Sequence, residues 1–170
     1  MTRVRSSAAV VCLLVLTAAC SAPPPAAPPA APFSVVEASM ADMQKAMAEG
    51  RVTSRQLVEQ YLQRIALYEE RLNATIAVNP KALEEADRLD AERRAGTLRG
   101  PLHGIPVALK DNIHTTDMPT TGGAVAFEGF IPPYEATLTK NLKDAGAIIL
   151  AKTMMTELAN FIAQGMPGNY

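Results

Sequence analysis

The stretch GPLHGIPVALKDN, residues 100–112, decides the fold class of this chain. Its first five residues are typical of a turn, and residues 105–109 form a nearly all-apolar run, as expected of a buried strand. A second all-apolar run, residues 147–151, follows a predicted helix over residues 136–145 that ends at Gly146. This strand–helix–strand order predicts an α/β fold, with a mixed sheet covered by helices on both faces.

Helical patterns dominate the residues before this stretch. Met40, Met43 and Met47 recur at helical spacing, and a capping box at residues 53–56 begins a second helix. Residues 74–78 predict a short strand, and Asn79 is the expected cap of a third helix that ends at Gly96. In the helix over residues 136–145 we expect Leu138 and Leu142 to point inward, and residues 153–161 also look helical.

The first 33 residues predict an export and anchoring segment. Residues 1–19 combine two early arginines, a short apolar run and small residues, which is the pattern of a signal peptide. The end of this run resembles a bacterial lipobox, which predicts that Cys20 carries a lipid; the alternative is an ordinary signal peptide cut after Ala19. Residues 20–33 then read as an Ala/Pro spacer before a globular domain, residues 34–170. The predicted location is the bacterial cell envelope, with a lipid anchor facing the periplasm.

Composition excludes several kinds of partner. The 16 Lys and Arg residues balance 17 Asp and Glu residues, so no basic stripe for nucleic acid is expected. His103 and His114 have no metal-ligand spacing around them, so we expect no metal and no cofactor, and His103 is interpreted as structural. Asp111 and Asn112 are expected to hold the following loop through side-chain to backbone hydrogen bonds.

Lys110 is the candidate catalytic residue because it directly follows the predicted strand of residues 105–109. Active sites of α/β proteins lie at the carboxyl ends of strands. A partly buried lysine loses its proton more readily, and a neutral lysine can act as a base toward a hydroxyl. We therefore expect Lys110 to be partly buried beside a cleft, and a side chain pointing freely into solvent would argue against its role. From position alone, a solvated lysine is the more common case.

The stretch of residues 100–112 closely resembles the lysine segment of the amidase signature family. The resemblance extends from about Val36 to Tyr170 and includes the segments 50–54, 72–74, 118–122, 145–153 and 157–159. It implies an amidase that hydrolyses non-peptide carbon–nitrogen bonds of small amide substrates with a nucleophilic serine, a second serine on a cis peptide bond, and a lysine. Lys110 matches that lysine, which implies a base toward the attacking hydroxyl and an acid toward the leaving amine.

The sequence also departs from the family pattern. Residues 1–170 contain no Gly-Ser-rich stretch that could supply the two serines, so we expect this chain alone, the N-terminal part of such a domain, to be inactive. Gly123 stands where the family commonly has Ser, and Met154 where it commonly has Asn. Two alternatives remain: a catalytically inactive envelope lipoprotein on the same scaffold, and the glutamine-hydrolysing subunit of a tRNA amidotransferase. The oligomeric state is not indicated.

Overall fold

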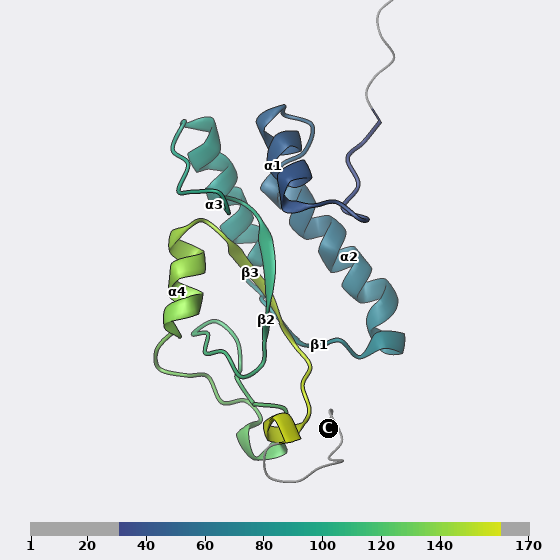
Figure 1. Ribbon diagram of the computed structural model, residues 1–170, viewed down its shortest axis with the longest axis vertical. Coiled ribbons are helices and arrows are strands. Elements are labelled where there is room, and N and C mark those ends of the chain that lie inside the picture. The colour runs from purple at the N-terminus through teal and green to yellow at the C-terminus, as the bar shows by residue number, and fades with distance from the viewer. Residues whose placement is uncertain (1–30, 161–170) are drawn as a thin grey trace, which may run out of the picture. The chain divides into compact units, whose positions relative to one another are not determined.

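The computed structural model describes residues 31–160 (Figure 1). Four α-helices, three strands and two short 3₁₀ helices follow one another in the order α1 Met40–Ala48, α2 Ser54–Leu72, β1 Thr75–Val78, α3 Ala82–Arg94, β2 Pro106–Lys110, a 3₁₀ helix Val125–Phe127, α4 Thr137–Asp144, β3 Ile148–Thr153 and a 3₁₀ helix Glu157–Asn160.

The three strands form one mixed sheet in the order β1-β3-β2. The central strand β3 runs parallel to β2 and antiparallel to β1. Its first five residues, Ile148 to Lys152, are all buried, which explains why this segment has almost no polar alternation. The sequence-based prediction of a mixed α/β sheet is therefore confirmed.

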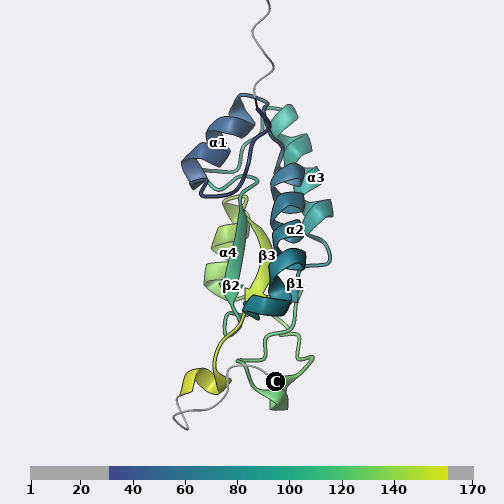
Figure 2. The same ribbon diagram turned by 90° about the vertical axis from the view of Figure 1, so that its right-hand side faces the viewer.

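Helices cover both faces of this sheet (Figure 2). Ile148 and Leu150 of β3 pack with Val58 of α2 and Ala86 of α3 on one face. On the opposite face, Ile149 packs in a second cluster with Leu109, Met118, Ile113 and Leu142 of α4. The alternation of Ile148, Ile149 and Leu150 between two cores follows from the period-two geometry of a strand.

Capping side chains fix where the first two helices begin. Thr53 and Gln56 form the capping box expected at α2, and Ser39 forms the same arrangement with Asp42 at α1. The third helix differs from expectation, because its first residue is Ala82 and its cap position is Lys81. Asn79 is instead buried, where its Oδ1 accepts from the Lys81 N–H (2.8 Å) and its Nδ2 donates to the Ile149 carbonyl (2.8 Å).

Two predictions near the end of the described residues are wrong. Leu138 is half exposed on α4 and does not point inward, whereas Leu142 does pack against the sheet. The helix expected over residues 153–161 is replaced by the end of β3 at Thr153 and a four-residue 3₁₀ helix, Glu157–Asn160. Pairing of Lys110 with Thr153 extends the strand, because backbone groups of β3 find partners in β2 that the local sequence does not reveal.

The predicted signal peptide, Cys20 and most of the spacer lie outside the described residues. Among residues 31–160, no helix combines the length and the apolar composition that crossing a membrane requires.

Candidate active site

Lys110 is the last residue of β2 and pairs with Thr153 at the carboxyl ends of the two parallel strands. The structure therefore places it at the predicted edge of the sheet. Its side chain is exposed within residues 31–160, so the expectation of partial burial is wrong for the described chain. The reason is topological, because β2 is an edge strand with β3 on one side and no described strand on the other.

The residue after Lys110 is the most heavily bonded of this region. The Asp111 N–H donates to the Thr153 carbonyl (3.1 Å), which continues the strand pairing, and the Asp111 carbonyl accepts from the Gly122 N–H (3.3 Å). Oδ2 of Asp111 accepts from the backbone N–H groups of Thr121 (3.0 Å) and Gly123 (3.4 Å), and from the Thr121 hydroxyl. The expectation that Asp111 holds the loop is confirmed; Asn112 is exposed instead.

A second lysine, Lys152 of β3, completes this network. Its side chain is fully buried, with Nζ 3.3 Å from Oδ1 of Asp111, which is also fully buried. Nζ further donates to the Thr120 hydroxyl (2.8 Å) and the Pro119 carbonyl (3.3 Å). Burial lowers the pKa of Lys152, and the charge and hydrogen bond of Asp111 oppose that shift only in part.

The loop of residues 119–123 is shaped by this pair and by two glycines with positive φ, Gly122 and Gly123. A Cβ added at Gly123 would lie 2.5 Å from the Met155 carbonyl oxygen, so this backbone has no room for a side chain there. The departure from the family's common Ser at position 123 is therefore matched by close approach of the loop to the segment that follows β3.

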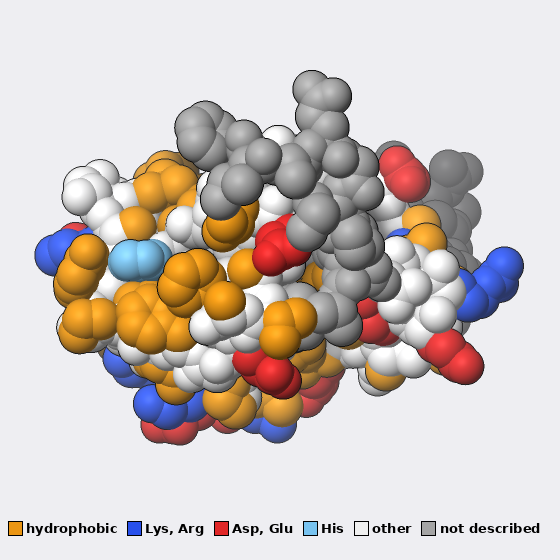
Figure 3. Space-filling model, turned by 90° about the horizontal axis from the view of Figure 1, so that it is seen from below, with side chains coloured by type: hydrophobic (Ala, Val, Ile, Leu, Met, Phe, Trp, Pro, Cys, Tyr) orange, Lys and Arg blue, Asp and Glu red, His pale blue; other side chains and the backbone are white. Residues whose placement is uncertain are grey.

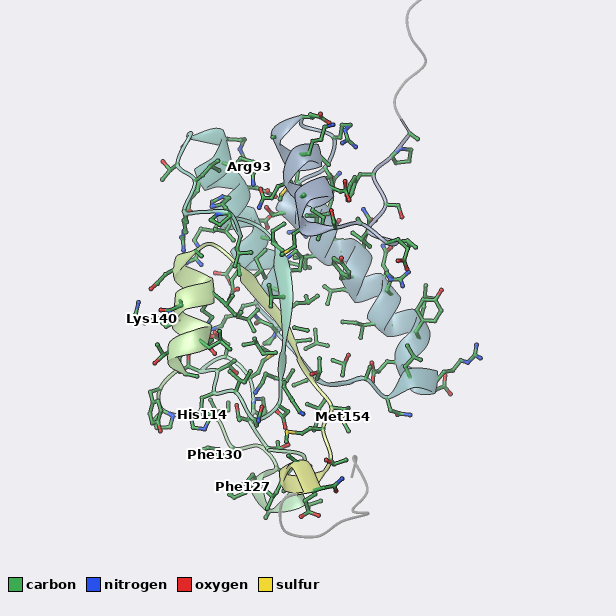
Figure 4. The ribbon with its side chains drawn as sticks, viewed as in Figure 1. Arg93, His114, Phe127, Phe130, Lys140 and Met154 are labelled. Carbon is green, nitrogen blue, oxygen red and sulfur yellow. The ribbon has the colours of Figure 1, made fainter. Side chains whose placement is uncertain are left out.

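Apolar side chains gather at the same end of the sheet (Figure 3). A shallow cavity of about 210 Å³ is lined there by His114, Phe127, Phe130 and Leu158, together with Asn112 and the loop 120–122. The His114 ring meets Phe130 edge-on at a centroid distance of 6.5 Å. Figure 4 shows His114, Phe127, Phe130 and Met154 at this lower end, below the strands. An apolar group of a ligand could contact this surface.

His103 has a structural role, as the sequence indicated. Its buried ring accepts the Arg99 N–H at Nδ1 (3.2 Å), and Nε2 lies 2.9 Å from the Leu89 carbonyl oxygen, so both ring nitrogens are satisfied. No three His, Cys, Asp or Glu side chains within residues 31–160 come together as they would around a metal ion.

Sequence reasoning assigned no function to Lys152, although it belongs to a family-like segment. The available signal was a charged residue that directly follows a run of five apolar residues in the predicted central strand. Such a residue is buried if the strand continues through it, and a buried charge requires a partner. The structure supplies Asp111 as that partner from 41 positions earlier in the chain.

Solved structures with this arrangement are amidases. The chain superimposes on the peptide amidase of Stenotrophomonas maltophilia with a TM-score of 0.74 and 48% identity, covering 76% of this chain and 27% of that one. An amidase family protein from Bacillus anthracis gives a TM-score of 0.74 at 38% identity, covering 80% of this chain and 28% of that one.

Sequence comparisons agree with the structural ones. One of the subunits of the glutamyl-tRNA(Gln) amidotransferase of Rhodopirellula baltica is 41% identical over 137 residues, 77% of this chain and 28% of that protein. The chain therefore spans little more than a quarter of the length of the relatives it matches. The Amidase family model matches residues 56–167, which include Lys110, Asp111 and Lys152. The chain accordingly belongs to the amidase family, whose members are hydrolases of carbon–nitrogen bonds.

Proposed function

We propose that this chain is the N-terminal part of a serine amidase in which Lys110 is the catalytic base. One observation carries the proposal: the family-matching lysine segment ends at Lys110, at the carboxyl ends of the parallel pair β2 and β3. This is the edge of an α/β sheet at which reacting groups are placed. Lys110 would deprotonate a bridging serine, which activates a nucleophilic serine for attack on an amide carbonyl.

The exposed side chain of Lys110 sets a requirement on this proposal. A lysine acts as a base near neutral pH only where its surroundings disfavour the ammonium form. The described residues leave Lys110 exposed, so polypeptide outside them has to cover it and supply both serines. The relatives in which the family match lies are about four times as long as the matched region, which is consistent with such additional polypeptide.

The proposed substrate is the non-peptide carbon–nitrogen bond of a small amide. The apolar cavity beside His114 and Phe130 supports an amide with an apolar substituent, because it opens two residues beyond Lys110 at Asn112. The peptide amidase similarity makes a peptide derivative an informative second substrate. A panel of a primary carboxamide, an anilide and an internal peptide bond would separate these classes by relative kcat/KM.

The decisive experiment is Lys110→Ala in the full-length enzyme. Loss of amide hydrolysis by a factor of about 10³ or more, with an unchanged melting temperature, supports the assigned role. Because Lys110 is exposed, its removal should not disturb folding. Turnover like that of the wild type would refute the role. Lys140→Ala, which also removes an exposed lysine, is the matched control and should keep full activity.

The amidotransferase reading is the second candidate function, favoured by 41% identity to the Rhodopirellula baltica protein. Under this reading, the enzyme would release ammonia from glutamine for a partner reaction. The predicted export signal of residues 1–19 argues against work on tRNA. Glutamine hydrolysis that depends on added aminoacyl-tRNA would favour this candidate over the amidase.

We further propose that Cys20 anchors the protein to the bacterial envelope with its globular domain facing the periplasm. The support is the order of charged start, short apolar run, small residues and cysteine, followed by an Ala/Pro spacer. Labelled fatty acid should be incorporated in a bacterial host and should be lost in Cys20→Ala. Equal labelling of both proteins would end this proposal, and a shortened unlabelled product would point to an ordinary signal peptide.

A further inference from the structure

Two lysines lie at the carboxyl ends of β2 and β3, but only one of them has described contacts. Lys152 directs its ammonium group into the loop that follows β2, where it meets the Asp111 carboxylate at 3.3 Å and the Thr120 hydroxyl at 2.8 Å. Both members of the ion pair are fully buried. A pair this dry costs desolvation free energy, so packing alone does not account for its presence.

Asp111 is the residue through which Lys152 can act on the candidate base. Its backbone N–H and C=O bond to Thr153 and Gly122, and the Ile113 N–H donates to the Lys110 carbonyl (3.0 Å). Its carboxylate gathers the amides of Thr121 and Gly123. The peptide unit that joins Lys110 to Asp111 is thereby fixed between β3 on one side and the loop on the other.

The charge of Asp111 requires a buried counterion for this arrangement to persist. Two backbone amides and one hydroxyl saturate Oδ2, whereas the charged partner of Oδ1 is the Lys152 ammonium group. Without that ammonium group, a buried carboxylate would have to protonate or move toward water. Either change would loosen the amides of Thr121 and Gly123 and the backbone beside Lys110.

We propose that Lys152 is a positioning residue, which uses the Asp111 carboxylate to hold Lys110 and the loop of residues 119–123 in one fixed arrangement. This inference rests on the proposed role of Lys110 as base. It assigns no contact with substrate to Lys152. The arrangement explains why a charged residue directly follows an apolar run in the central strand, because only a side chain rooted on β3 reaches Asp111 from beneath the loop.

The test compares Lys152→Met with the neutral pair Asp111→Asn/Lys152→Met in the full-length enzyme. Lys152→Met should lower kcat about tenfold or more while KM changes less, because a displaced base costs rate and leaves ground-state binding largely intact. Amide hydrogen exchange of Thr121 and Gly123 should accelerate about tenfold or more. The neutral pair should recover much of both losses, since Asn can still accept from these amides. Lys140→Met, the same substitution at an exposed ion pair with Asp144, should change neither.

A purely structural role predicts a different result. Lys152→Met would then lower the melting temperature but leave kcat per active site within about twofold of wild type below that temperature; this outcome overturns the inference. If Lys152→Met fails to fold, Thr120→Val replaces it, because it removes one acceptor of the ammonium group and keeps both charges. About fivefold faster exchange of Thr121 and Gly123 with a reduced kcat supports the inference. An unchanged kcat overturns it.

Failure of the proposed function is distinguishable in the same series. If Lys110→Ala retains activity, Lys110 is not the base and the proposed function fails. If Lys110→Ala is inactive and Lys152→Met keeps its kcat, only the positioning role fails.

Discussion

Lys110 and Lys152 lie on neighbouring parallel strands, one position apart in register, yet Lys110 is exposed and Lys152 is fully buried against Asp111. The difference follows from sheet order. Lys110 ends the edge strand β2, and Lys152 lies on the central strand β3, which has a neighbour on each side. The structure thus contains a reactive-lysine candidate and a buried ion pair at the same end of the sheet.

The Lys152–Asp111 pair should show strong non-additivity in stability. Removing either charge alone leaves the other buried without its ionic partner, which costs about 3–5 kcal/mol. Asp111→Asn/Lys152→Met removes both charges and should be less destabilised than either single variant. Denaturant unfolding of the four proteins measures the coupling. Additive losses would show that the two charges do not depend on each other.

The same pair predicts a pH dependence in the alkaline range. Burial lowers the pKa of Lys152 below its ordinary value of 10.5, so the unfolded chain holds this proton more tightly than the folded one. Stability contributed at this site therefore rises with pH between the lowered pKa and 10.5, by at most about 1.4 kcal/mol per pH unit. The free energy of unfolding of wild type, minus that of the neutral pair, should increase over this range. A decrease would show that the Lys152 pKa is raised instead.

Asp90 of α3 should stabilise the start of α2. Its carboxylate accepts the N–H groups of Ser54 (2.7 Å) and Arg55 (3.0 Å), two amides that the helix itself leaves without partners. Asp90→Ala should cost about 2–3 kcal/mol, because hydrogen bonds to a buried charge at a helix N-terminus are lost. Asp87→Ala on the same helix removes only an exposed ion pair with Arg55 and should cost under about 1 kcal/mol. Equal losses by thermal unfolding would contradict the assignment.

Two glycines after helices should tolerate alanine very differently. Gly96 after α3 and Gly146 after α4 both have positive φ, 76° and 89°. A Cβ at Gly146 would lie 2.7 Å from the His103 Cα, whereas a Cβ at Gly96 meets nothing within 4 Å. Gly96→Ala should therefore cost only the left-handed strain of about 1–2 kcal/mol. Gly146→Ala should cost about 1–3 kcal/mol more, as overpacking requires His103 to move. Similar melting temperatures for both variants would contradict this.

Local sequence signals predicted most helices and strands correctly where capping and periodicity act within a few residues. Thr53 and Gln56 cap α2 because both partners lie three residues apart and need no tertiary context. Leu138 and the segment after Thr153 were predicted wrongly because their environment depends on distant strands. The catalytic role of Lys110 and the lipid on Cys20 remain predictions from sequence, and the experiments above test them.

By itself, the sequence determined the α/β class, the position of Lys110 at a strand end and the family to which the chain belongs. These depend on apolar periodicity and on short motifs, which are properties of neighbouring residues. Only the tertiary structure decided which lysine is buried, since Asp111 and Lys152 are far apart in the chain and meet through the parallel pairing of β2 with β3. Burial depends on what lies on both sides of a strand, and strand order is not written in the local pattern.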